Sequence, residues 1–316
     1  MAPYFDVNQQ RYYPLIENRR FSDAVNDGLS WLEFEKRSNP TRYATEPKGT
    51  PFYFLGIAAF ASHDYQTAAF FFDAAVAEDI HHYPGDNDKP ALMFMRLEAR
   101  GEAATPVVEI IVKRLGAALD DYHDRDGSRR SLTLPDVREH FLNHLERPHL
   151  RTLTTAFVSF LAEWDYRLQM IDLPTVGVSR EPFFTHLFRG CLLFESLLRD
   201  KAPLNPPESW SEYFRRKLRL RTRVRHNTLG YLLRVHRNAL NIGRVRTSSS
   251  SFEGILSDLR SREPLRGAIR CTARTRNTLG HDLAWVAQSL DRQSYNLLAS
   301  NISASCLHAI ARLYVP

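Results

Sequence analysis

The segment Arg274–Leu283, RTRNTLGHDL, brings an arginine, an amide and a histidine close together. Arg276 and His281 flank four residues, and Asn277 directly follows the arginine. A neutral imidazole near pH 7 acts as a general base, and its protonated form acts as a general acid. A guanidinium is always charged and stabilises an anionic phosphorane. Together these residue types could perform acid–base chemistry beside an anionic group, with Asn277 as a further polar contact.

Helical geometry limits how these side chains meet. A predicted helix over Glu263–Leu290 carries an apolar line, and Arg276 falls on it. The line consists of Ile269, Ala273, Leu279, Leu283, Val286 and Leu290. Because an unpaired charge on a buried stripe is costly, Arg276 is expected to be paired in the core or to face an internal cleft. Asn277 and His281 are four residues apart and face one another. Arg276 and His281 are about 140° apart around the helix, so they converge only through the long arginine side chain or across a dimer.

Four predicted helices make the C-terminal half an α-helical bundle. They span Pro182–Asp200, about Glu208 to Leu240, Glu263–Leu290 and Ser294–Tyr314. The connection Asn241–Gly254 is rich in serine and is expected to be flexible. Gly280 and Ala284 are small and four residues apart, which would let a neighbouring helix approach closely. The sequence thus predicts an all-α fold in this half.

The second helix of the bundle is unusually basic. Its segment KLRLRTRVR alternates basic and apolar residues as a strand would, but both flanks are helical in pattern. If the segment is helical, arginines surround much of its circumference. A face that is only solvated does not require this arrangement, whereas an electrostatic track for nucleic acid does. The candidate RNA-binding residues are Arg215, Arg216, Arg219, Arg223 and Arg225, together with Arg270 on the third helix.

Charge divides the chain into two halves. Residues 1–179 hold 19 Lys and Arg against 26 Asp and Glu, a net charge of −7, whereas residues 180–316 hold 23 against 10, a net charge of +13. The basic residues are 36 arginines and 6 lysines. Arginine suits bidentate contacts with phosphate, although a compositional bias of the genome would give the same excess. A polyanionic partner is therefore expected at the C-terminal half.

Arg180–Pro316 resembles the HEPN family, in which an arginine, four to six further residues and a histidine lie on the third helix of a bundle. The polar residue after the arginine, here Asn277, belongs to that pattern. Other arginine–histidine pairs in the chain share the spacing. Only Arg276 and His281 combine it with a following Asn, a site that opens a helix, and one more long apolar helix before the end of the sequence.

The resemblance implies a metal-independent endoribonuclease of a toxin or antiviral defence system. In this family two Arg–His sets meet in one cleft of a homodimer, which implies a composite site and 2′,3′-cyclic phosphate products. It implies catalytic roles for Arg276, Asn277 and His281, and no metal or cofactor. Arg274 is a possible further site residue. Glu195, on the first helix, either reaches the cleft as an extra polar group or is a surface or capping residue. The alternative function is a non-catalytic scaffold or regulatory protein, because some HEPN domains are inactive binding modules.

The N-terminal half, residues 1–175, reads as paired helices. Pro51–Ile80 contains two helical segments around the turn SHDY, with small residues at fixed offsets and aromatic residues between them. This unit resembles a tetratricopeptide repeat, with a weaker echo in Leu15–Glu35 and a looser third pair in Ala91–Tyr122. Such repeats usually bind a protein partner. The stretch IDLPTVGVSREP, with two prolines and a glycine, marks the boundary to the half that spans residues 180–316.

Two further stretches invite a metal or loop interpretation. HHYPGDNDKP and DDYHDRDGSRR are both expected to be solvated connections. His140 and His144 lie at i,i+4 and are either a metal pair or, as we expect, surface or packing histidines; no catalytic Glu lies between them. We predict no metal site.

Cysteine usage and hydropathy suggest a cytoplasmic protein. Cys191, Cys271 and Cys306 are scattered without metal-type spacing, and we expect them to be reduced core thiols. No apolar run approaches the roughly 18 residues of a membrane span, and the N-terminus lacks the layout of a signal peptide.

Overall fold

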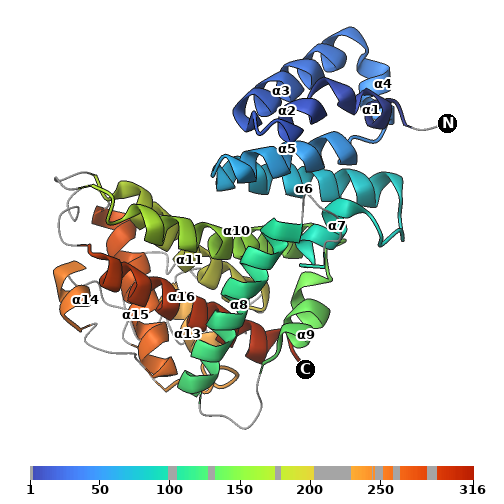
Figure 1. Ribbon diagram of the computed structural model, residues 1–316. Coiled ribbons are helices and arrows are strands. Elements are labelled where there is room, and N and C mark those ends of the chain that lie inside the picture. The colour runs from blue at the N-terminus through green and yellow to red at the C-terminus, as the bar shows by residue number, and fades with distance from the viewer. Residues whose placement is uncertain are drawn as a thin grey trace, which may run out of the picture. The chain divides into compact units, whose positions relative to one another are not determined.

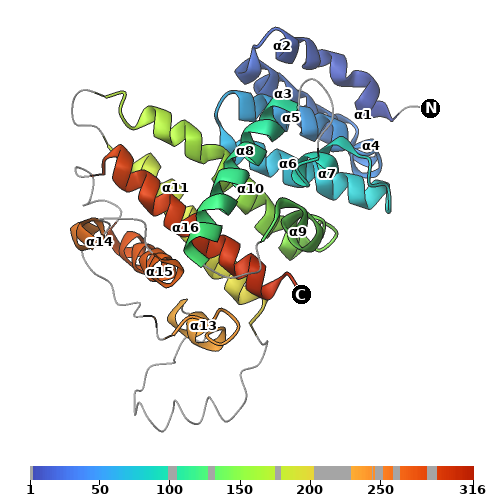
Figure 2. The same cartoon turned by 60° about the horizontal axis from the view of Figure 1, so that its bottom comes forward.

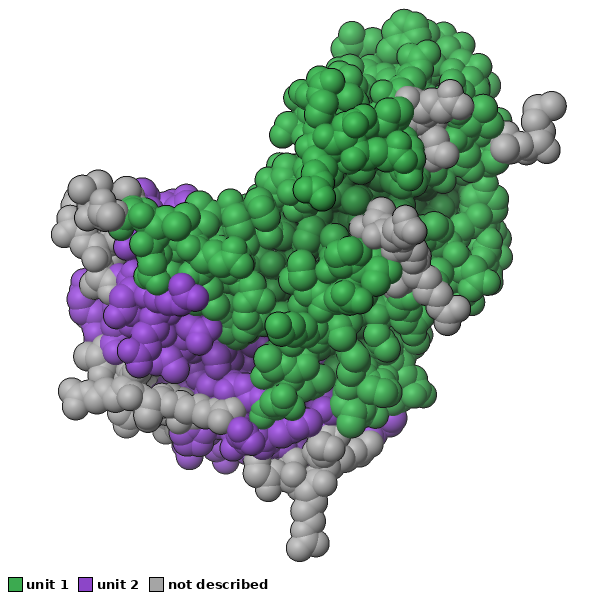
Figure 3. All heavy atoms as spheres, viewed as in Figure 1, with its two compact units in different colours: residues 1–120, 133–174 green, residues 121–132, 175–316 purple. Residues whose placement is uncertain are grey.

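The computed structural model describes most of the chain. It describes residues 3–98, 105–126, 132–174, 179–202, 229–243, 245, 252–258, 264–282 and 290–316, without the side chains of Gln9, Gln10, Ser257, Asp258, His281 and Asp282. Every regular element in these ranges is a helix, so the all-α class is confirmed for them. The chain divides into two compact units, shown in green and purple in Figure 3. Unit 1 comprises residues 1–120 and 133–174, and unit 2 comprises residues 121–132 and 175–316.

The break after residue 174 lies within the stretch that the prolines and glycine indicate, but the units differ from two simple halves. Residues 121–132 belong to unit 2 although they precede residues 133–174 of unit 1. The charge asymmetry is the same for the units as for the halves. Unit 1 has 16 Lys and Arg against 23 Asp and Glu, and unit 2 has 26 against 13, which again gives −7 and +13.

Unit 1 is built from helices of very different length (Figure 1). They are α1 (Tyr4–Val7), the 3₁₀ turn η1 (Asn8–Arg11), α2 (Tyr13–Glu17), α3 (Phe21–Ser38), α4 (Pro40–Thr45), α5 (Gly49–Ala61), α6 (Tyr65–His82), α7 (Pro90–Met95), most of α8 (Thr105–Asp126), α9 (Leu134–Val137), the π-helical turn η2 (Arg138–Leu142) and α10 (Pro148–Met170). Helix α5 packs against α3 and α6, and α6 packs against α10.

The predicted helix pair around SHDY is present as α5 and α6, joined by Ser62–Asp64. The Asp64 side chain caps α6 by accepting a hydrogen bond from the Thr67 amide at 3.1 Å. A Cβ at Gly56 would lie 2.8 Å from the Phe72 ring, so only glycine lets the two helices approach this closely. The aromatic ring of Phe72 in turn stacks on Phe94 of α7, with 4.0 Å between ring centroids.

Unit 2 contains α11 (Glu181–Asp200), α13 (Leu229–Val235), α14 (Phe252–Asp258), α15 (Leu265–Asp282) and α16 (Arg292–Leu313), together with the last turn of α8. Helices α11, α15 and α16 pack against one another in all three pairs, and Figure 2 shows them side by side. Residues 301–310 of α16 are all buried, so α16 is the central helix of the unit. The bounds of α11 and α16 agree with the predicted helices to within two residues.

Three predictions for this unit need correction. The second helix was expected to continue to Leu240, but α13 ends at Val235 and the chain then turns, with Asn241 in a left-handed conformation at φ 50°. The last three residues of the predicted flexible connection, 252–254, are helical, because α14 begins at Phe252, which is buried and packs edge-on against Phe184. The serine-rich residues 246–251 lie outside the described residues. The first seven residues of DDYHDRDGSRR are helical and not a solvated connection, because α8 continues to Asp126; residues 127–130 lie outside the described residues.

Candidate active site

Helix α15 holds Arg276 on its buried side. Ile269, Ala273 and Leu279 have no exposed surface, which confirms that part of the predicted apolar line. Arg276 lies between Ala273 and Leu279, and its side chain is 29% exposed. The prediction that Arg276 lies at the start of a helix is wrong, because α15 begins at Leu265. Gly280 is not required by close packing, since a Cβ there would meet Phe188 at an ordinary 3.6 Å.

Glu195 of α11 is the partner of this arginine. Arg276 Nε donates to Glu195 Oε2 at 2.7 Å, and Arg199 Nη2 donates to Glu195 Oε1, also at 2.7 Å. Glu195 is only 3% exposed, so the expectation of a surface or capping residue is wrong. A carboxylate removed from water needs such partners. The two guanidinium groups supply them, one to each carboxylate oxygen.

The ion pair leaves the outer edge of the Arg276 guanidinium available. Nη1 makes a long contact of 3.4 Å with Asn277 Oδ1. Nη2 donates no hydrogen bond within the part of the chain that the structure describes. The buried carboxylate of Glu195 therefore orients the Arg276 guanidinium through Nε. The Nη atoms of Arg276 remain the donors that a ligand oxygen would meet.

The backbone of α15 extends through His281, five residues after Arg276. The His281 side chain lies outside the described residues, and so does its predicted contact with Asn277. The basic track of Arg215, Arg216, Arg219, Arg223 and Arg225 lies outside them as well. Arg270 is exposed on α15, and Arg274 is half-buried.

The described histidine side chains of unit 2 outside α8 are structural. His186 pairs with Tyr295 at 2.8 Å, His236 bonds the Leu198 carbonyl at 2.7 Å, and His308 bonds the Leu240 carbonyl at 2.7 Å. Each is buried. Burial lowers the pKa of His236 and of His308, because the charged imidazolium is disfavoured away from water. These three side chains hold loops and helices of the bundle together, and burial disfavours the charged form of His236 and of His308.

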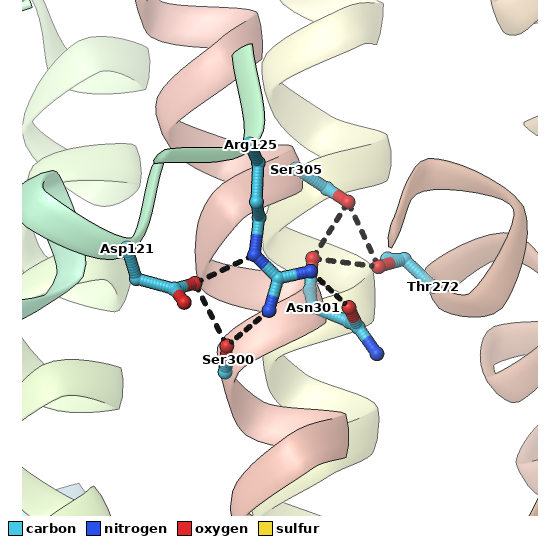
Figure 4. A network of polar contacts seen from close by, with 6 residues as sticks. All are labelled: Asp121, Arg125, Thr272, Ser300, Asn301 and Ser305. Carbon is cyan, nitrogen blue, oxygen red and sulfur yellow. Dashed lines mark hydrogen bonds and ion pairs between the residues drawn. The ribbon is translucent and has the colours of Figure 1, made fainter. Parts of the chain in front are cut away.

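A second polar cluster supports α15 one turn before Arg276 (Figure 4). Arg125, at the end of α8, donates to Asp121 at 2.8 Å, to Ser300 at 2.7 Å and to Asn301 at 2.6 Å. The backbone carbonyl of Asn301 also accepts a hydrogen bond from Thr272 Oγ1 at 3.2 Å. Thr272 lies four residues before Arg276, so this cluster ties the end of α8 and α16 to the helix that carries the candidate site.

The sequence did not single out Arg125, although a signal was present. The buried residues of α8 continue at helical spacing through Leu115, Leu119 and Tyr122 to Arg125. Tyr122 is 1% exposed, and its hydroxyl contacts His308 Nδ1 at 3.2 Å. The acidic, glycine-containing composition of the stretch masked this periodicity.

The histidines, acidic residues and cysteines of the described ranges are arranged as follows. No group of three or more His, Cys, Asp or Glu side chains within them is arranged to hold a metal ion. His140 lies in the π-helical turn η2, whereas His144 lies beyond it, so the two do not share one helix face. The three cysteines are free and buried, as predicted. Burial raises the pKa of the Cys191 thiol well above its ordinary value.

Comparisons with protein-family models, curated proteins and solved structures gave no match to this chain. None of the helices in the described ranges is both long and apolar enough to cross a bilayer.

Proposed function

We propose that unit 2 is a HEPN-type, metal-independent endoribonuclease in which Arg276, Asn277 and His281 act on RNA. The observation that carries the proposal is the fixed guanidinium of Arg276, which a buried carboxylate holds through Nε while its Nη edge stays available. The net charge of +13 of unit 2 supports a polyanionic substrate.

In the proposed reaction, a neutral His281 imidazole removes the proton from a ribose 2′-hydroxyl. The 2′-oxygen attacks the adjacent phosphorus, and Arg276 stabilises the charge of the resulting phosphorane. The bond from phosphorus to the 5′-oxygen then breaks, and an imidazolium protonates the leaving oxygen. The products are a 2′,3′-cyclic phosphate and a 5′-hydroxyl, so no water, metal or cofactor is consumed.

One chain supplies one such histidine, whereas the reaction uses a base and an acid. We therefore propose a homodimer through the bundle, in which each protomer contributes an Arg276–His281 set. Unit 1, with its tetratricopeptide-like helix pairs, binds a protein partner in this proposal. The biological setting we propose is a cytoplasmic toxin or antiviral effector.

The test uses the full chain. Purified protein is incubated with a labelled RNA in the presence of EDTA, and the 3′ ends are analysed for cyclic phosphate. We expect cleavage by the wild type, a loss of about 100-fold or more with H281A, and a similar loss with R276A. H140A, in unit 1, is the matched histidine control and keeps full activity. Absence of cleavage by a wild-type dimer, together with no growth defect on expression, would contradict the proposal.

The same ion pair also favours the alternative, a non-catalytic scaffold, because Glu195 gives Arg276 a structural role. The two functions differ in the outcome of the R276K substitution. A scaffold tolerates lysine as the partner of Glu195 and keeps its assembly. A ribonuclease loses activity, because lysine lacks the planar fork that contacts two phosphate oxygens.

A further inference from the structure

A pocket in unit 1 has the features of a binding site for a cationic group. It lies where α1, the start of α5, the end of α6 and the start of α7 meet, and its volume is about 130 Å³. One water needs only about 10–15 Å³ measured in this way, so the pocket admits a group of several heavy atoms. Its lining includes Asp6, Thr50, Tyr53, Asp79, Tyr83 and Lys89.

Asp79 is the unusual member of this lining. It is 5% exposed and lies in the last turn of α6, where the helix dipole disfavours a negative charge. Its carboxylate makes no hydrogen bond and no ion pair with any residue that the structure describes. A buried acid without a partner is costly, so a natural ligand would be a group that donates to it.

The absence of a side chain at Gly49 leaves room for the Asp79 carboxylate. Gly49 begins α5, and a Cβ there would clash with Asp79 Oδ1. Any other residue at position 49 would push the acid away from its place. The geometry therefore keeps Asp79 at the pocket wall.

The remaining lining suits a cation as well. Asp6 adds a second acidic group, and Tyr53 and Tyr83 add aromatic rings. The Tyr83 ring already contacts one cation of the chain, because Lys89 Nζ lies 3.6 Å from the centre of that ring and 3.4 Å from Asp86. Aromatic faces and carboxylates together are the usual means of recognising ammonium and guanidinium groups.

We infer that this pocket binds the basic side chain of a partner protein, with Asp79 as the acceptor for its guanidinium or ammonium group. The inference deepens the proposed role of unit 1 in binding a protein. It does not depend on RNA cleavage, because binding is measured without RNA.

The probes are N-acetyl-arginine-methylamide, its neutral citrulline analogue, and a peptide Gly-Gly-Arg-Gly-Gly with blocked ends. Binding to the full-length protein is measured by calorimetry at about pH 8, above the pKa of Asp79, which burial raises to about 7. We expect the arginine probe to bind and the citrulline analogue not to bind. A peptide that binds at least as well as the capped arginine supports a protein side chain as the ligand. Binding of the capped arginine but not of the peptide would overturn that source.

Two variants move the affinity in opposite directions. D79N removes the charge with little change in shape and is expected to weaken the arginine probe by about 10-fold or more, as for a lost charged hydrogen bond. K89Q removes a competing cation and is expected to tighten binding by about 2- to 5-fold, the range of an exposed ion pair. Structural damage does not produce such a gain. The matched control D27N alters an exposed acid of α3 and leaves the affinity unchanged.

Protonation supplies an independent readout. Asp6, Glu78 and Asp86 oppose ionisation of Asp79, whereas Lys89 and the N-terminus of α5 favour it. Binding should therefore weaken between about pH 8 and pH 5.5 in the wild type as Asp79 becomes protonated. Equal affinity of wild type and D79N for the arginine probe, with both proteins folded by circular dichroism, would refute the inference.

Discussion

Arg276 of α15 and Glu195 of α11 are 81 positions apart in the chain and are joined by a hydrogen bond of 2.7 Å between Nε and Oε2. The carboxylate is buried and the guanidinium is partly exposed. The pair therefore fixes one edge of the arginine and presents the other. This single contact gives the candidate site its geometry and also makes it part of the bundle core.

The pair predicts that stability and activity can be separated. R276A leaves Glu195 with Arg199 alone and should lower the free energy of unfolding by about 1.5–3 kcal/mol, the range of a hydrogen bond to a charged group. The double variant R276M/E195L removes both charges and should recover most of this loss, because apolar replacements of a buried pair are often neutral. Urea denaturation measures the stability. RNA cleavage should stay absent in both variants, and its return in the double variant would contradict the catalytic role.

Arg274 and Arg276 should differ in effect. Arg276 is the arginine that Glu195 orients, whereas Arg274 is half-buried on the next face of the helix. R276A should reduce cleavage by about 100-fold or more, and R274A should change it by much less. The rates are compared at saturating RNA, so that weaker binding is not mistaken for slower chemistry. If R274A abolished cleavage and R276A did not, the catalytic role would belong to Arg274, and the assignment to Arg276 would be wrong.

The Arg125 cluster should contribute to the stability of unit 2. R125A removes donors from Asp121, Ser300 and Asn301 at a position that is 8% exposed. We expect a loss of about 3–5 kcal/mol, as for breaking a buried charged network. K113A, at an exposed position of the same helix, is the control and should change little. Chemical denaturation followed by tryptophan fluorescence measures both variants.

Replacing Gly56 of α5 and Gly116 of α8 by alanine should change the stability of unit 1 in opposite directions. A Cβ at Gly56 meets the Phe72 ring at 2.8 Å, whereas a Cβ at Gly116 of α8 meets no atom within 4 Å. G56A should therefore destabilise by about 1–3 kcal/mol through overpacking. G116A should stabilise by about 0.5–1 kcal/mol, because alanine is the better helix former. Thermal melting of the two variants under one condition tests the difference.

Asp79 makes stability depend on pH in a defined direction. Burial raises its pKa from 3.8 to about 7, so the native state keeps a proton that the unfolded chain releases between these values. The free energy of unfolding should fall as pH rises from about 4 to 7, by at most ~1.4 kcal/mol for each pH unit, and then level off. The difference between wild type and D79N, measured at about pH 5 and pH 8, isolates this contribution. A constant difference would contradict it.

Local patterns in the sequence were sufficient for the helix pair of unit 1 and for α11 and α16. Their small and apolar residues repeat at helical spacing over several turns, and SHDY supplies a cap at Asp64. The end of α13 could also have been predicted from the sequence, because the asparagines and the glycine after Val235 are helix breakers. The hydrophobic line of α15 indicated that Arg276 is either paired in the core or faces an internal cleft, and the structure shows it paired with Glu195.

The partners themselves were beyond local patterns. Glu195 lies 81 positions from Arg276, and Asn301 lies 176 positions from Arg125. A helix pattern shows which face is buried but not which helix covers it. The polar residues in DDYHDRDGSRR suggested a loop, because composition does not reveal that α16 offers Ser300 and Asn301 to Arg125. The tetratricopeptide-like and HEPN-like arrangements stay predictions.

The interleaving of the two units has a consequence for the order in which the protein matures on the ribosome. Arg125 leaves the exit tunnel early, yet its acceptors Ser300 and Asn301 belong to α16 and emerge 175 and 176 residues later. Meanwhile residues 133–174 complete unit 1. Unit 2, which carries the candidate site, thus finishes folding after unit 1, and a prematurely terminated chain retains unit 1 without the acceptors that α16 gives to Arg125.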